Sequence, residues 1–277
     1  MAVILALCSA ATYGVGDFCG GMASRRVAAT TVLLWSHLLG LLLLLATAPF
    51  VGGDAGSGDL LAGALGGLAG AIGVGMLYQG LSVGPMSVVA PITALLSGLV
   101  PVSVGLVQGD RPSVGAVVGM VAALVAIVLV SAEGGGRLRP SDWRGVGFAL
   151  GAGLGFGVFF VALSYAGDDS GIWPLVAART ASVGVVGSLA LLGYVSRAAP
   201  RGQALAFTTV AGALDAAANV FYLLAIREGL LSVVSVLTAL YPVGTILLAR
   251  VVLKERFASL QRFGMLIAAP AAILMAI

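Results

Sequence analysis

Residues 84–95 of the chain read GPMSVVAPITAL and residues 229–240 read GLLSVVSVLTAL, at a constant offset of 145 positions. The agreement continues into the next apolar segment, where Arg111 corresponds to Arg256 and Gly119-Met120 to Gly264-Met265. Random apolar sequence would match some leucines and valines, but not glycine, serine, threonine and arginine in one register. The stretch therefore predicts an internal duplication, so that the whole fold follows from what one copy can form.

The composition outside this stretch is that of a membrane protein. Of 277 residues, 60% are hydrophobic and 9% charged, and the mean hydropathy is +1.12, which excludes a soluble domain. The net charge of +3 comes from basic residues scattered over short loops, so we expect no nucleic-acid partner. Cys8 and Cys19 lie in the first apolar segment as small packing residues, and no cluster of metal ligands occurs. We expect neither a metal nor a cofactor.

Ten apolar segments are long enough to cross a bilayer, which needs about 20 residues per helix. They cover residues 2–24, 30–50, 60–80, 86–107, 114–132, 145–166, 172–195, 203–226, 230–250 and 259–277. We therefore expect an all-α integral membrane protein of two five-helix halves, residues 1–132 and 145–277, joined by a polar linker at 133–144. Because five is odd, the second half enters the bilayer from the opposite side, which gives the inverted repeat of many secondary transporters.

The basic residues predict the orientation of the chain. One set of alternating loops holds 11 arginines and lysines, whereas the other holds two, Arg111 and Arg227. The positive-inside rule puts the richer set in the cytoplasm and both termini on the other side. We expect a protein embedded in lipid, in a bacterial cytoplasmic membrane, as a monomer or homodimer.

Several motifs resemble those of the drug/metabolite transporter superfamily in its ten-helix EamA form. They are Tyr13 to Phe18 followed by Arg25-Arg26, Gly84 to Pro91, Gly109 to Ser113, and Lys254-Glu255-Arg256. The resemblance implies a carrier of small solutes, and it does not specify the cargo. This chain has Tyr13 where the family often has tryptophan before glycine, and its arginines argue against the cytoplasmic termini usually drawn for the family.

Three charged residues, Asp17, Arg179 and Asp215, fall at membrane depth, where each costs roughly 2.5 to 3.5 kcal/mol on insertion scales. Asp215 is central in the eighth segment, and Asn219 and Tyr222 follow on the same helical face. This face predicts a cargo site in which Asp215 binds a proton or a cationic group. The alternative is an aspartate that only holds helices together. Arg179 lies at a similar depth and predicts either an ion pair with Asp215 or a contact with an anionic group of the cargo.

Other candidates surround this face. Asp17 follows Tyr13 by one helical turn, so both are candidates for the cargo pathway, and Asp17 also for proton coupling. His37, the only histidine, is either a proton-coupling group or a packing residue. Pro91 and Pro242 interrupt the repeated fourth and ninth segments and predict hinges or cavity-lining kinks, or else static bends.

The repeat offset also predicts an asymmetry. Subtracting 145 from Asp215, Asn219 and Tyr222 gives Gly70, Val74 and Leu77, none of which has a polar side chain. We therefore expect the central polar face to belong to the second half alone.

These features favour a secondary transporter that moves a small metabolite or drug-like solute by alternating access, with proton-coupled efflux as one mode. A channel or passive facilitator is the first alternative, although no ring of like charge or carbonyl filter is evident. An intramembrane enzyme is less favoured, because one histidine and two separated cysteines supply few catalytic groups. We expect the chain not to be an enzyme.

Overall fold

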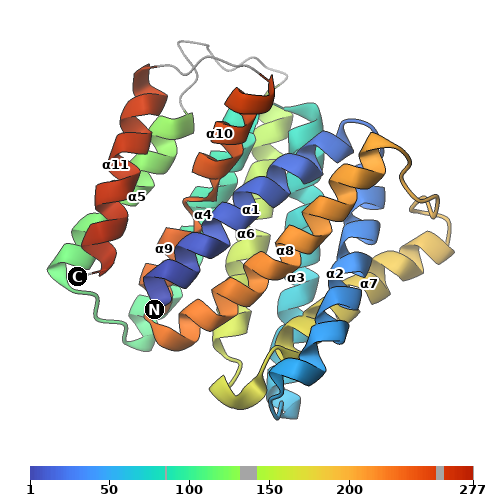
Figure 1. The fold of residues 1–277 in the computed structure, drawn as a ribbon, viewed down its shortest axis with the longest axis horizontal. Helices are drawn as coiled ribbons and strands as arrows, with labels where there is room; N and C mark the ends of the chain where they lie inside the picture. Colours follow the sequence, from blue (N-terminus) through green and yellow to red (C-terminus); the bar gives the residue numbers. More distant parts are fainter. Residues whose placement is uncertain (85, 132–141, 254–258, 277) are drawn as a thin grey trace.

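The computed structural model describes residues 1–84, 86–131, 142–253 and 259–276, and in these residues helices joined by short connections account for the fold (Figure 1). The first half contains α1 (Ala2–Ser24), α2 (Ala29–Val51), α3 (Ser57–Val83), α4 (Met86–Gln108) and α5 (Val114–Ser131). The second contains α6 (Asp142–Ser164), the short η1 (Asp168–Ser170), α7 (Trp173–Leu191), α8 (Gln203–Glu228), α9 (Leu231–Thr238), α10 (Tyr241–Leu253) and α11 (Ser259–Ala276). The part of the chain described contains no strand.

Eight of the described helices are long and apolar enough to cross a membrane, and two shorter apolar segments are Val114–Val130 and Leu231–Thr245. A bilayer core offers backbone groups no water, so only elements that satisfy their own N–H and C=O groups can span it. This requirement explains why glycine-rich stretches such as α3 and α6 remain helical. The expected all-α membrane fold is confirmed.

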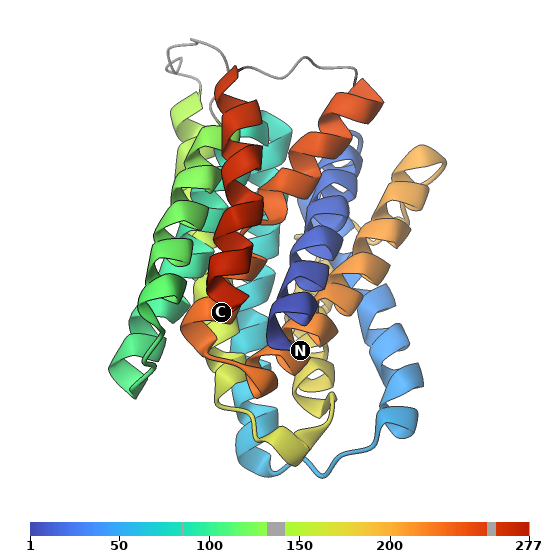
Figure 2. The same ribbon diagram turned by 60° about the vertical axis from the view of Figure 1, so that its left-hand side comes forward.

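The two halves have inverted topology. Adding 145 to the bounds of α5 gives the bounds of α11, and adding 145 to α4 gives the start of α9 and the end of α10. Both termini lie at one end of the bundle, and α1 runs away from this end (Figures 1 and 2). Helix α6, the first helix of the second half, instead runs towards it.

Two expected spans differ from the structure. The ninth, predicted as one helix over 230–250, is broken into α9 and α10 after Thr238. The physical reason is Pro242, which has no N–H to bond the carbonyl of residue 238 and whose ring would clash with it. The seventh, predicted over 172–195, ends at Leu191. The expected polar linker lies largely outside the described residues, and α6 begins at Asp142.

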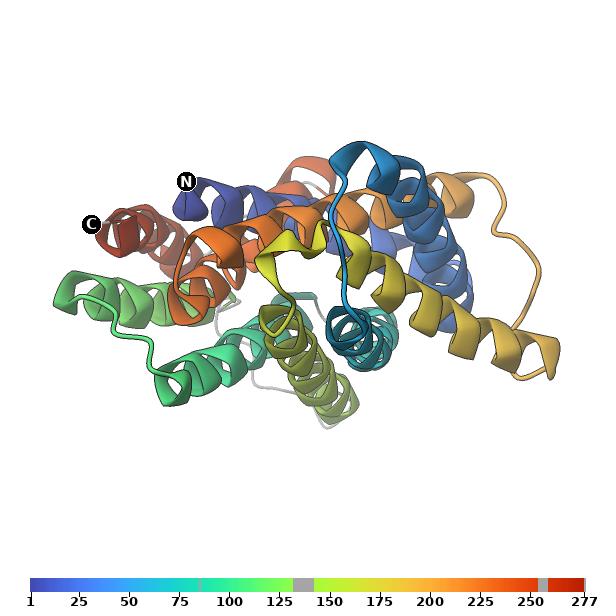
Figure 3. The same cartoon turned by 90° about the horizontal axis from the view of Figure 1, so that it is seen from below.

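The two halves pack against each other through pairs of helices, one from each half. Helix α1 packs along α8, α3 packs along α6, and α5 pairs with α11 at one edge of the molecule (Figures 1 and 3). Glycine permits this approach: a Cβ added to Gly155 would lie 2.8 Å from the carbonyl oxygen of Ala69. Such small residues let helix backbones come together where lipid supplies no hydrophobic driving force. The α1–α8 and α3–α6 pairs enclose the centre of the bundle.

Candidate functional site

A small cavity lies between the two halves, near the middle of the bundle. Its free volume is about 20 Å³, which is room for about one water molecule. Ten residues from five helices line it: Tyr13, Gly67, Gly70, Val74, Phe156, Phe159, Ala178, Arg179, Asp215 and Asn219. Four of the ten, Tyr13, Arg179, Asp215 and Asn219, are among the residues that the sequence predicts to bind cargo. The structure therefore brings most of the candidate site together.

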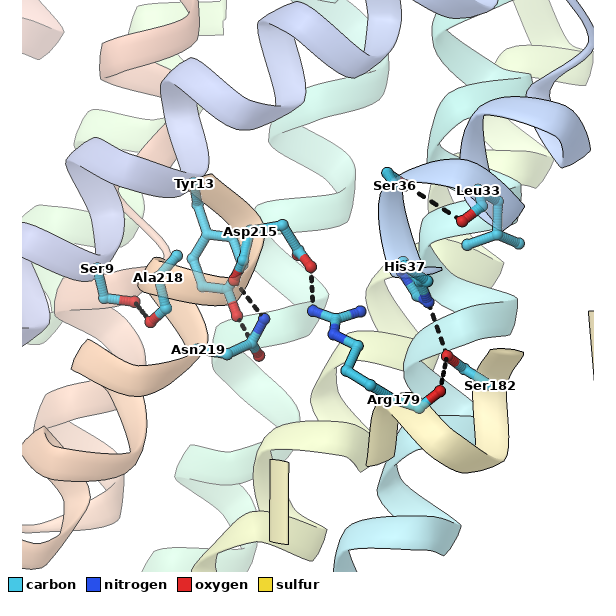
Figure 4. A network of polar contacts seen from close by, with 10 residues as sticks. All are labelled: Ser9, Tyr13, Leu33, Ser36, His37, Arg179, Ser182, Asp215, Ala218 and Asn219. Atoms are coloured by element: carbon cyan, nitrogen blue, oxygen red, sulfur yellow. Dashed lines mark hydrogen bonds and ion pairs between the residues drawn. The ribbon is translucent and has the colours of Figure 1, made fainter. Parts of the chain in front are cut away.

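An ion pair crosses one wall of this cavity. The Nη2 atom of Arg179 on α7 donates to Oδ2 of Asp215 on α8, and the two side chains are only 9% and 16% exposed (Figure 4). This is the interhelical pair that the similar depths of the two residues predict. No other ion pair occurs among the residues that the structure describes. A buried pair of this kind is stable only while both charges stay together, because either charge alone would be uncompensated.

Asn219 connects this pair to the first half. One turn after Asp215, its Nδ2 donates to the backbone oxygen of Asp215 at 2.6 Å. Its Oδ1 accepts a hydrogen bond of 2.7 Å from the hydroxyl of Tyr13 on α1 (Figure 4). These two bonds fix the orientation of the amide. They also correct the expectation that the polar face belongs to the second half alone, since Tyr13 comes from the first.

Asp17 is buried one turn after Tyr13, with 9% of its surface exposed. Its carboxyl group is close enough to Asp215, Tyr78 and Tyr241 for electrostatic interactions. No described cation forms an ion pair with it. The centre of the bundle thus holds two carboxyl groups and one guanidinium in close proximity.

The opposite wall of the cavity is apolar and closely packed. A Cβ on Gly67 would overlap the backbone of Ala178, and a Cβ on Gly70 would lie 3.3 Å from the ring of Phe159. Ala178 of α7 and Phe159 of α6 therefore occupy the space that side chains at these two glycines would need. Sequence reasoning missed this wall as part of the site. The signal was present, because Gly70 and Val74 are the repeat equivalents of Asp215 and Asn219.

The remaining candidates lie away from the cavity lining. Tyr222 is fully buried, its hydroxyl is 2.9 Å from Oγ of Ser235, and its ring stacks on Phe160 with centroids 4.2 Å apart. Pro91 is buried within the continuous helix α4, whereas Pro242 is buried at the break between α9 and α10.

His37 on α2 bonds Ser182 on α7, with 2.8 Å between Nδ1 and Oγ (Figure 4). These two residues are 145 positions apart, which makes them repeat equivalents that meet where the halves face each other. Sequence reasoning identified His37 but missed its partner, although the same offset relates the two.

The end of the bundle that carries the termini is closed by contacts between connections of the two halves (Figure 2). Asp59 accepts from the backbone N–H of Gly167 at 2.7 Å, and the N–H of Asp54 donates to the oxygen of Asp169 at 2.9 Å. Arg227, at the end of α8, donates to the backbone oxygens of Gly167 and Gly171. Sequence reasoning assigned no role to these loop residues.

Comparisons with known proteins agree with this architecture. A family model described as the EamA-like transporter family matches residues 1–132 and 143–277. The chain is also similar to a solved structure that is described only as a crystal structure of a protein, with a TM-score of 0.75 and 17% sequence identity. The alignment covers 99% of this chain and 95% of that chain. At this identity the likeness shows the fold alone. The search of curated proteins gives no match.

Proposed function

The chain belongs to the EamA-like transporter family, within the drug/metabolite transporter superfamily, and we propose that it is a secondary carrier working by alternating access in the bacterial cytoplasmic membrane. The family consists of membrane solute transporters rather than enzymes. The observation that carries the proposal is the buried Arg179–Asp215 pair, which lines a cavity between two inverted halves. Secondary transporters place their sites near the bilayer midplane at such a repeat interface.

The ion pair provides a means of coupling binding to movement. Cargo that contacts Asp215 or Arg179 competes with the partner side chain, and a buried charge that loses its partner costs about 3 to 5 kcal/mol. Cargo that replaces the lost contact removes this penalty, so the pair opens only when the site is filled. We propose Asp215, Arg179, Asn219 and Tyr13 as the contact residues, and we leave Tyr222 out because Ser235 and Phe160 already occupy its polar and aromatic surfaces.

The small size of the central cavity also supports alternating access. A cavity of about 20 Å³ is too small for a metabolite, so cargo can enter only if the halves move apart at one end. The loop contacts of Asp59 with Gly167 and of Asp54 with Asp169 join the two halves at the end with the termini. A permanently open pore would not need this closure, which favours a carrier over a channel.

The charge distribution supports an orientation with both termini outside. In the described part of the chain, the α1–α2 and α7–α8 connections and the starts of α6 and α11 lie towards the end opposite the termini (Figure 1), and they carry Arg25, Arg26, Arg144, Arg197, Arg201 and Arg262. The end with the termini has the α2–α3, α4–α5, α6–α7 and α8–α9 connections with the adjoining helix ends (Figure 1), and these carry Arg111 and Arg227 together with Asp54, Asp59, Asp110, Asp168, Asp169 and Glu228. By the positive-inside rule, the closed loops described above then face away from the cytoplasm.

Replacing Asp215 tests the site directly. A thermal-shift screen of amino acids, sugars, nucleosides and organic cations supplies a cargo, and its flux is measured in liposomes. We expect saturable uptake that counterflow stimulates, and at least about a tenfold loss of flux in Asp215→Asn, which corresponds to about 1.4 kcal/mol of lost binding. Asp169→Asn is the matched control, because that side chain is exposed at the end of the bundle.

Three outcomes would contradict the proposal. Unchanged flux in Asp215→Asn would remove this residue from the site. Unsaturable conductance would indicate a channel, and chemical conversion of the cargo an enzyme.

We further propose that Asp17 carries the coupling proton, because it lacks a cationic partner among the described residues and lies close enough to Asp215 to feel the charge of that carboxylate. Asp17→Asn cannot release a proton, so we expect it to lose uptake driven by a pH gradient while counterflow exchange continues. Both modes are measured in the same liposomes. Equal loss of both modes would show that Asp17 does not act specifically in coupling.

A further inference from the structure

We assign the proton on the His37 ring from the hydrogen bonds around it. The Ser182 hydroxyl donates its single hydrogen to the backbone oxygen of Arg179 at 3.2 Å. With the hydroxyl hydrogen assigned in this way, Oγ accepts from His37, whose Nδ1 lies 2.8 Å away. In the neutral imidazole the proton is then on Nδ1, and Nε2 is left with a free lone pair. This relay holds the ring with Nε2 as an acceptor.

Nε2 has no partner although the side chain is 3% exposed and the atom itself is buried. A buried acceptor without a donor is costly, and such groups in native structures need an explanation. The guanidinium of Arg179 is close enough to His37 to interact electrostatically with its ring. In Figure 4 the guanidinium of Arg179 lies between the carboxylate of Asp215 and the ring of His37.

The backbone of α2 leaves room beside this guanidinium. Gly40 lies one turn after His37, and a Cβ added there would be 3.6 Å from Nε of Arg179. The face of α2 that carries His37 therefore runs alongside the guanidinium, with no side chain at Gly40 to obstruct it. Arg179 has five N–H donors, and in the described structure its one side-chain acceptor is Asp215.

We propose that His37 is a positioning residue for Arg179: its Nε2 is the second acceptor to which the guanidinium transfers when cargo takes Asp215. A guanidinium released inside a membrane protein needs another acceptor, and the neutral side-chain acceptors beside it are already in use, which leaves Nε2 of His37 and the carboxyl group of Asp17. Oδ1 of Asn219 accepts from Tyr13, and Oγ of Ser182 accepts from His37. The role is a hydrogen bond to a neutral imidazole and needs no titration of the histidine.

This inference rests on the proposed site, but its test requires no transport. His37 is the only histidine in the sequence, so protein labelled with ¹⁵N-histidine gives one assigned pair of imidazole signals. A non-histidine affinity tag preserves this advantage. Asp215→Ala removes the carboxylate acceptor and imitates the state in which cargo holds it. We expect the Nε2 signal to shift upfield in this variant, because accepting a hydrogen bond moves an unprotonated ring nitrogen in that direction.

The double variant Asp215→Ala with Arg179→Met is the matched control, and its signal should return to the wild-type position because the donor is gone. If Asp215→Ala does not fold, Asp215→Asn serves in its place, with a smaller shift because the amide oxygen still accepts. An unshifted Nε2 signal in the folded variant overturns the proposal, and it would indicate that Arg179 turns to Asp17 or to water. A shift that persists without Arg179 overturns it as well.

A transport measurement separates positioning from packing. Glutamine can place a neutral oxygen near the position of Nε2, whereas leucine fills a similar space without an acceptor. We expect His37→Leu to lower kcat at least about tenfold with little change in KM, and His37→Gln to restore most of kcat. Equal loss in both variants would show that the imidazole only packs. If the wild type itself moves no cargo, the proposed function fails, and the ¹⁵N result still decides the role of His37.

Discussion

Helices α3 and α8 occupy equivalent places in the two halves and face the same cavity, yet they carry opposite chemistry. On α8 the lining residues are Asp215 and Asn219, and on α3 the residues 145 positions earlier are Gly70 and Val74. The same contrast holds for Arg179 of α7, whose equivalent on α2 is Leu34. The duplication has kept the backbone of both halves, but the ion pair lies in the second half alone.

This difference separates two requirements of a carrier. Alternating access needs two halves that can exchange conformations, and the matching helix bounds provide them. Recognition needs one arrangement of charge, and a second copy would place another ion pair in the same small cavity. The apolar wall instead supplies a close-packed surface of glycine and phenylalanine. Variants that replace polar residues of the second half by the residues of the first half, or that fill the apolar wall, test this separation.

The largest effect is expected from removing one partner of the ion pair. Arg179→Leu introduces the residue found at the equivalent position of the first half, and it leaves Asp215 buried without a cation. We expect a loss of about 3 to 5 kcal/mol in the free energy of unfolding, because an unpaired buried charge is strongly unfavourable. Denaturant unfolding in detergent measures this change.

The double variant Arg179→Leu with Asp215→Ala tests the reason for that loss. Because it removes both charges, we expect it to recover most of the stability while transport stays absent. Its control is Arg201→Leu, which removes an exposed arginine at the end of the bundle. A double variant as unstable as the single one would show that the pair matters for packing rather than for charge.

Sequence patterns predicted the fold well because each element leaves a strong local signal. The apolar segments predicted α1 over the residues that it occupies and α4 to within one residue. The break in the ninth segment was missed, since a proline in an apolar run is compatible with either a kinked helix or two helices. Which of these forms depends on how neighbouring helices satisfy the freed backbone groups.

The charged residues of the site could be predicted from the sequence, whereas its apolar residues could not. A charge at membrane depth is costly, so Asp215 and Arg179 stood out, and their similar depth made an ion pair between them one of the two alternatives for Arg179. Phe159 is one apolar residue among many, and only the three-dimensional packing against Gly70 shows that it lines the cavity. Tyr222 shares a helical face with Asp215, but helical spacing does not reveal that Ser235 is its partner.

A smaller effect is expected from filling the apolar wall. In Gly67→Ala the new Cβ would overlap the backbone of Ala178, so α3 and α7 must separate. We expect a loss of about 1 to 3 kcal/mol, the usual cost of overpacking, together with reduced transport. Gly147→Ala is the matched control, since a Cβ there has nothing within 4 Å and should be neutral or slightly stabilising. Equal behaviour of the two variants would show that the wall is not closely packed.

The smallest effect is expected from Tyr13→Phe, which removes the hydrogen bond that joins the halves through Asn219. The loss should be about 1 kcal/mol, the net value of one such bond, because a water molecule in the adjacent cavity can satisfy the freed Oδ1 of Asn219. We expect KM for cargo to rise while kcat changes little, since the amide loses its fixed orientation. Tyr165→Phe, at an exposed position, is the control. If Tyr13→Phe matched that control in both stability and KM, the first half would contribute no polar contact to the face of α8 that carries Asp215 and Asn219, and the contrast between α3 and α8 would extend to α1.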